Sequence, residues 1–167
     1  MHQDTMKKLI GLIAGLIFGA TAVAHEQVDF RVAIPDTWKL VSYSTEENLW
    51  TYESHDGSHR LMVSVLYYSQ ETNHSQQGQF LNDFIKTRQE QSSKIETDIQ
   101  FSETEIKEYE AAWVAKFKES SSKGRFASTK VISSKIGIAN FYFESVSSST
   151  FHEEVSDEIL ATTGFSS

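Results

Sequence analysis

NLWTYESHDGSHRLMVSVLYYS, residues 48–69, carries the strongest structural signal in this chain. At its centre Asp56-Gly57 separates two apolar-rich runs, and both residues tolerate positive φ at low cost. The stretch therefore predicts a β-hairpin with strands over 48–54 and 58–69. Apolar side chains occupy both faces of the second strand, with Leu61, Val63, Val65 and Tyr67 on one face and Met62, Leu66 and Tyr68 on the other. This pattern predicts a central strand that is covered on both sides.

The segment before the hairpin predicts two further strands. Apolar residues at 28, 30, 32 and 34 alternate with polar or small ones, which is the period of a strand with one buried face. Pro35 ends this strand because proline has no N–H to donate to a ladder. The second strand is expected from Trp38 to Ser44.

A helix is expected after the hairpin, over Ser75 to Lys94, with Ser75 as its N-cap. Its apolar face has helical spacing and comprises Phe80, Leu81, Phe84, Ile85 and Arg88. Four more strands are expected over 98–107, 111–119, 124–132 and 137–147.

The chain is expected to finish with a short second helix. Thr150 and Glu153 have the spacing of a capping box at its start. Phe151, Val155 and Ile159 form its buried edge, and Phe165 follows as an anchor for the tail.

Four strands, a helix, four strands and a helix predict an α+β protein with a largely antiparallel sheet. The opening run VDFRVAIPDTW, Val28 to Trp38, resembles the F-x-V-x-x-P-x-x-W start of Mog1/PsbP-like domains. The order of the later elements is also similar, so the resemblance covers His25 to Phe165. It implies an αβα sandwich around an antiparallel sheet. Members of that group are mostly non-enzymatic binding or assembly factors, exported immunity proteins among them, and the resemblance carries over no functional residues.

Residues 1–24 have the pattern of a cleavable secretory signal. Two lysines precede an apolar run from Leu9 to Ala20, and Ala22-Val23-Ala24 supplies the small residues of a cleavage site. The run is shorter than the roughly 20 residues that span a bilayer. We therefore expect a signal peptide over 1–24 and a single domain over 25–167 in the periplasm, without a membrane anchor.

Charge and cysteine content narrow the function. Without the leader the chain has 13 basic and 22 acidic side chains, a net charge of 13 − 22 = −9. This balance argues against a nucleic-acid partner, because phosphate binding needs Lys and Arg, and it suits a basic protein partner. The chain has no cysteine, which excludes thiolate catalysis and thiolate metal sites.

Histidines offer the only metal-binding alternatives. His25, as a new N-terminus, would chelate copper through its amine and imidazole if His55, His59 or His74 supplied a second imidazole. The turn at 55–59 holds two imidazoles and one carboxylate. Zinc prefers three or four ligands in a tetrahedron, and two residues on opposite arms of the turn could contribute, but nothing supplies the rest. His152-Glu153 begins like a zincin motif, but Ser156 stands where the second histidine is needed. We therefore expect no metal, no cofactor and no catalytic residues.

The sequence is best interpreted as an exported, non-catalytic binding protein, in its concrete version an immunity or inhibitor factor against an effector delivered to the periplasm. Contacts to a basic protein partner are assigned to acidic residues on loops and edges, namely Asp56, Glu103, Glu105 and Glu108. A carrier of a small molecule or lipid, with an apolar pocket between the sheet and the helix over 75–94, is the first alternative. A copper-binding enzyme that uses His25 is the second.

Overall fold

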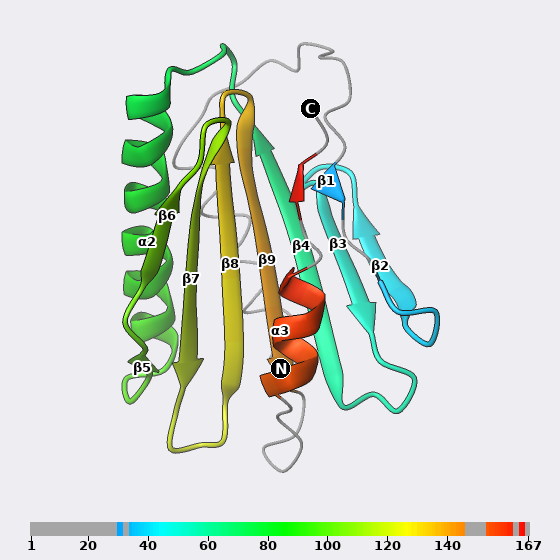
Figure 1. The fold of residues 1–167 in the computed structure, drawn as a ribbon. Coiled ribbons are helices and arrows are strands. Elements are labelled where there is room, and N and C mark those ends of the chain that lie inside the picture. The colour runs from blue at the N-terminus through cyan, green and yellow to red at the C-terminus, as the bar shows by residue number, and fades with distance from the viewer. Residues whose placement is uncertain (1–29, 32–33, 146–152, 162–163, 166–167) are drawn as a thin grey trace.

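A computed structural model describes residues 30–31, 34–145, 153–161 and 164–165 of this chain. Within these ranges, eight strands form one antiparallel sheet in the order β2-β3-β4-β9-β8-β7-β5, and β6 also pairs with β7 (Figure 1). The strands are β2 (Lys39–Ser44), β3 (Leu49–Glu53), β4 (His59–Tyr67), β5 (Gln100–Phe101), β6 (Glu105–Glu108), β7 (Ala112–Ser120), β8 (Phe126–Ser134) and β9 (Gly137–Ser145). The expected antiparallel α+β architecture is confirmed.

The hairpin of β3 and β4 forms where the sequence predicts it, and β4 lies inside the sheet between β3 and β9. Its turn differs in detail from the prediction. Gly57 has a φ of 70°, but Asn48 is the one non-glycine residue with positive φ in the described ranges, so Asp56 does not adopt that conformation. Asp56 instead accepts hydrogen bonds from the Ser54 hydroxyl at 2.6 Å and the Ser58 N–H at 3.0 Å. A longer turn of this kind is held by its side chains.

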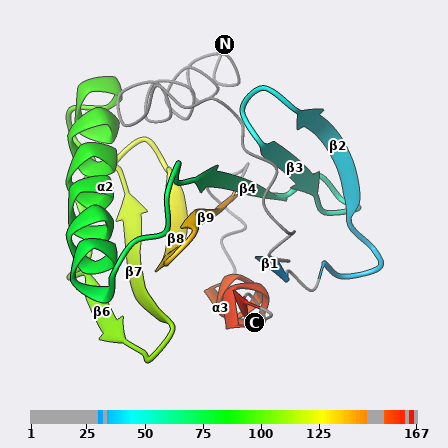
Figure 2. The same cartoon turned by 90° about the horizontal axis from the view of Figure 1, so that it is seen from above.

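The helix α2 (His74–Ile95) covers one face of the sheet, over β7 and β8 (Figure 2). Its N-cap is Asn73, two residues before the predicted Ser75, and Asn73 and Gln76 form a capping box. The face expected from helical spacing is the buried one, and Arg88 is 2% exposed. The apolar cluster on this face comprises Tyr68, Leu81, Phe84, Ile85, Ala115, Phe117, Val131 and Ile138.

The helix α3 (Glu153–Ala161) covers the opposite face. Ile159 and Leu160 are buried and pack with Val63, Phe141 and other residues of the central strands. Side chains in register across an antiparallel sheet point to one face, so this core continues into the row Val63, Phe141 and Lys130. Neither described helix is long and apolar enough to cross a membrane.

Two expected strands differ from the structure. The strand expected over 98–107 is split into β5 and β6, because the Ser102 hydroxyl accepts a hydrogen bond from the Lys118 N–H and interrupts the ladder with β7. The strand expected at 28–34 contributes β1 (Phe30–Arg31), which pairs with β10 (Gly164–Phe165) in a separate two-stranded sheet. Residues 1–24, His25, Thr150, Phe151 and His152 lie outside the described ranges.

Candidate functional site: a basic groove on the α3 face

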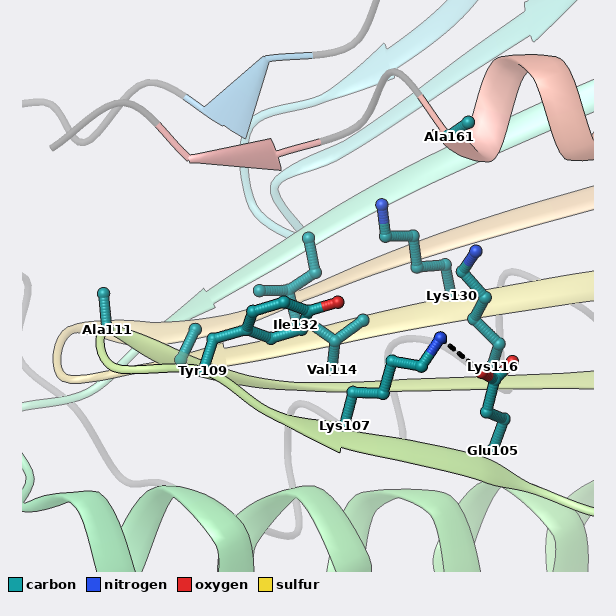
Figure 3. Close-up of a pocket in the computed structure, with 10 residues that line it drawn as sticks. Glu105, Lys107, Tyr109, Ala111, Val114, Lys116, Lys130, Ile132 and Ala161 are labelled. Carbon is teal, nitrogen blue, oxygen red and sulfur yellow. Dashed lines mark ion pairs between the residues drawn. The ribbon is translucent and has the colours of Figure 1, made fainter.

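A half-open groove lies on the α3 face of the sheet, over β6, β7 and β8 and beside the end of α3. Its volume is about 470 Å³, within the range typical of small-molecule sites. Figure 3 shows the side chains that line it. These are Glu105, Lys107, Tyr109, Ala111, Ala112, Val114, Lys116, Lys130, Ile132 and Ala161.

Strand register explains why these residues meet. Glu105 is the cross-strand partner of Lys116, and Lys116 is the partner of Lys130, so one row runs from β6 to β8. Lys107, Val114 and Ile132 form the neighbouring row. Residues opposite each other in an antiparallel sheet have Cβ atoms about 5 Å apart. The groove is therefore a charged row beside an apolar floor.

Lys130 is the buried cation of the groove, with 7% of its surface exposed. Its Nζ donates a hydrogen bond of 2.8 Å to the carbonyl oxygen of Leu160, in the last turn of α3. Burial, with a smaller contribution from the positive charge of Lys116, lowers the pKa of Lys130 to about 8. Both causes act against the ammonium form.

The outer rim of the groove is polar and exposed. Lys107 Nζ lies 2.6 Å from a carboxylate oxygen of Glu105. This hydrogen bond and ion pair lower the pKa of Glu105 and raise the pKa of Lys107. Tyr109 stands at the rim with 53% of its surface exposed. An exposed ion pair of this kind opens easily to a competing ligand.

The acidic residues predicted as contacts do not form one site. Glu103, Glu105 and Glu108 lie along the edge at β6, where Glu105 contacts Lys107 and a Glu108 oxygen lies 2.8 Å from His74 Nε2. Asp56 lies in the turn between β3 and β4, on the other side of the central strands. There its hydrogen bonds from Ser54 and Ser58 hold its pKa well below the usual range.

The histidines proposed as copper ligands are also dispersed. His59 is buried against Trp38 and Phe143, with a ring nitrogen 2.7 Å from the Ser58 hydroxyl. His74 lies at the start of α2, and His55 is exposed in the hairpin turn. Over the residues that the structure describes, no three His, Asp or Glu side chains are grouped as metal ligands would be.

Sequence reasoning missed Lys116 and Lys130. Both fall inside predicted strands, and a lysine in the middle of a strand next to apolar residues was the signal available. The pocket of the carrier alternative was expected under the helix at 75–94, but that interface holds Leu81, Phe84, Val131 and their neighbours. The groove lies on the opposite face, and the cross-strand register that forms it is not readable from spacing alone.

A second charged cluster lies on the α2 face and differs in kind. The Glu119 carboxylate is fully buried, with one oxygen 3.2 Å from Arg88 and the other 3.2 Å from Arg125. These are ion-pair distances without hydrogen-bond alignment at Glu119. Arg88 stacks on the Tyr142 ring at 4.7 Å, and Arg125 donates to the Tyr142 hydroxyl at 2.9 Å. Glu96, with a carboxylate oxygen 3.7 Å from Arg125, supplies the second negative charge, so the cluster is internally matched, as expected of a structural element.

Comparison with known proteins identifies the fold. No family model matches the sequence, and no curated protein is similar to it. A cyanobacterial PsbP from Synechocystis sp. PCC 6803, CyanoP, has a similar solution structure, with a TM-score of 0.54 at 12% sequence identity. The similarity covers 91% of this chain and 100% of that one. The architecture expected from the opening run and the order of elements is thus confirmed, and this chain has a PsbP/Mog1-like fold.

Proposed function

We propose that this protein is a non-catalytic binding protein that holds a small anionic molecule with an apolar part in the groove on the α3 face. One observation carries the proposal. In a chain with a net charge of −8, three lysines converge on one groove whose floor is apolar. Local positive charge against the overall charge indicates a site for an anion.

The ligand class follows from the two rows of the groove. The Lys116 and Lys130 row supplies charge for a carboxylate or a similar anion, while Val114 and Ile132 supply apolar contact. An anion between the lysines would offset their mutual repulsion and the desolvation of Lys130. A molecule with both an acidic group and a hydrocarbon body satisfies both rows, as fatty acids do.

Calorimetric titration of the full-length protein with dodecanoate tests this proposal. We expect binding that weakens at least tenfold in Lys116→Met and Lys130→Met variants. Dodecanol, which has the same chain without the charge, is expected to bind more weakly than dodecanoate. Lys86→Met is the matched control. Lys86 is an exposed residue of α2, and this substitution removes the same positive charge away from the groove.

Two results would contradict the proposal. Equal affinities in the Lys116, Lys130 and Lys86 variants would place the ligand elsewhere. Equal affinities for dodecanoate and dodecanol would remove the role of the lysines.

A protein-binding role, as an immunity or inhibitor factor, is the second candidate, and the edge at β6 favours it. Glu103, Glu105 and Glu108 lie along this edge, next to Ile106 at 41% and Tyr109 at 53% exposure. Acidic residues around exposed apolar ones suit a basic partner. A photo-cross-linker placed at Ile106 in the native cell, compared with one at exposed Lys86, tests this role. Equal cross-linking yields at Ile106 and Lys86 would contradict this role. So would a yield at Ile106 that does not fall as the salt concentration rises.

We also propose that the protein acts in the periplasm after cleavage behind Ala24. The support is the leader pattern of residues 1–24. N-terminal sequencing of the protein from fractionated cells is expected to read His25 first, in the periplasmic fraction. Recovery of the uncut chain in the membrane fraction would contradict this.

A further inference from the structure

We propose that Lys130 is a covalent capture site that forms an imine with an aldehyde or ketone carrying an anionic group. This inference rests on the proposed function, because the groove must first admit the anionic ligand. It adds a reactive atom, the Lys130 Nζ, and a chemical class of ligand. It assigns Lys116 the role of moving a proton.

The placement of Lys130 is that of an activated lysine. Its side chain lines the groove yet is more than nine-tenths buried, and its Nζ is oriented by the hydrogen bond to the Leu160 carbonyl. A second ammonium, Lys116, occupies the directly opposite cross-strand position. Desolvation and a neighbouring cation are the two devices that make a lysine amine nucleophilic near neutral pH.

The protonation state supports this chemistry. With a pKa of about 8, roughly one Lys130 in ten is a neutral amine at pH 7, whereas an ordinary lysine is neutral in about one molecule in three thousand. Among the residues whose side chains the structure describes, the charged groups near Lys130 include Lys116 on β7, with Glu105 and Lys107 beyond it on β6. On α3, Asp157 is exposed, and the side chains of the other acidic residues are outside the described set.

The capture step is balanced without any other reactant. The neutral Nζ attacks the carbonyl carbon, and a proton passes from nitrogen to oxygen to give a carbinolamine. The Lys116 ammonium then donates a proton to that hydroxyl, which leaves as water, while the nitrogen lone pair forms the C=N bond. Lys116 recovers its proton from the iminium nitrogen, so the net products are one imine and one water.

Reductive trapping tests the inference on the full-length protein. The probe is 4-carboxybenzaldehyde with sodium cyanoborohydride, and mass spectrometry after digestion measures the labelled fraction at each lysine. We expect Lys130 to be labelled at least tenfold faster than Lys86 at pH 7. Lys116→Met is expected to slow labelling at Lys130, and Lys130→Arg to abolish the fast phase while keeping the positive charge.

A parallel titration separates the two proposals. The probe is 4-methylbenzoate, which has the anion and the ring but no carbonyl to capture. If 4-methylbenzoate binds in the groove while Lys130 is labelled no faster than Lys86, the capture site is overturned and the binding function stands. If 4-methylbenzoate and dodecanoate both fail to bind, the binding function fails as well. Fast labelling that belongs to Lys116 instead of Lys130 would also overturn the inference.

Discussion

Two buried cations, on opposite faces of the same sheet, have opposite surroundings. Arg88, under α2, lies 3.2 Å from the Glu119 carboxylate and stacks on Tyr142. Lys130, under α3, bonds to a main-chain carbonyl and faces another lysine. Arg88 is matched by charge within the core, whereas Lys130 lies at the wall of a groove. Burial of a charge is a structural feature in the first case, and in the second it is the basis of the proposed binding site.

The choice of residue type fits each role. A guanidinium keeps its charge at any accessible pH and suits a permanent internal pair. A lysine amine gives up its proton when it is desolvated, so it can respond to what enters the groove. The variants below test whether the two cations really differ in this way.

The largest effect is expected from Glu119→Gln. This change leaves Arg88 and Arg125 with an uncharged neighbour in a fully buried position, and breaking a buried pair costs on the order of 3 kcal/mol of unfolding free energy. Urea unfolding followed by circular dichroism measures it. Glu105→Gln, which alters an exposed ion pair, is the control and should leave the midpoint unchanged. A similar small change in both variants would make the Glu119 cluster dispensable.

Lys130→Met is expected to change how the free energy of unfolding depends on pH. The folded-state pKa of about 8 lies below the unfolded value of 10.5, so the unfolded chain binds more protons between these pH values. Stability of the wild type relative to Lys130→Met should therefore rise from pH 8 to pH 10.5, by on the order of 2 kcal/mol. Urea midpoints measured across this range give the difference. A flat difference would mean that Lys130 titrates like an exposed lysine.

A smaller shift is expected from Lys116→Met. Removing the opposite ammonium takes away one cause of the lowered pKa of Lys130 but leaves its desolvation, which is the larger cause. The pKa of Lys130 should rise by less than about one unit. The pH profile of reductive labelling at Lys130 reports it. A full return to 10.5 would show that the neighbouring charge, and not burial, dominates.

The smallest effect is expected from Asp56→Ala, in an exposed turn. The folded-state pKa of Asp56 is lowered by hydrogen bonds from Ser54 and Ser58, so its contribution is present above the unfolded value of 3.8 and is lost as the pH falls. Acid unfolding curves of the wild type and Asp56→Ala should therefore differ near neutral pH and converge in strong acid. Curves that diverge further in acid would reverse this assignment.

Local signals in the sequence predicted most of the fold. Asp56-Gly57 placed the hairpin, and the spacing of Leu81, Phe84 and Arg88 identified the buried side of the central helix, because these patterns depend only on near neighbours. The groove depends on the register of three strands, which is fixed by turns and by the Ser102 interruption. Helical spacing also placed Arg88 on the buried face. It did not predict the ion pair with Glu119, because Glu119 lies on β7, a different element.

The central pairing of β4 with β9 has a consequence for how the chain folds. It joins Leu61 to Phe143 and Val63 to Phe141, which are about eighty positions apart, while β7, β8 and β9 follow one another by short turns. Loop closure makes such distant pairing slow compared with neighbouring hairpins. Closure of the middle of the sheet by β4 and β9 is therefore expected to follow formation of the local hairpins of β7, β8 and β9.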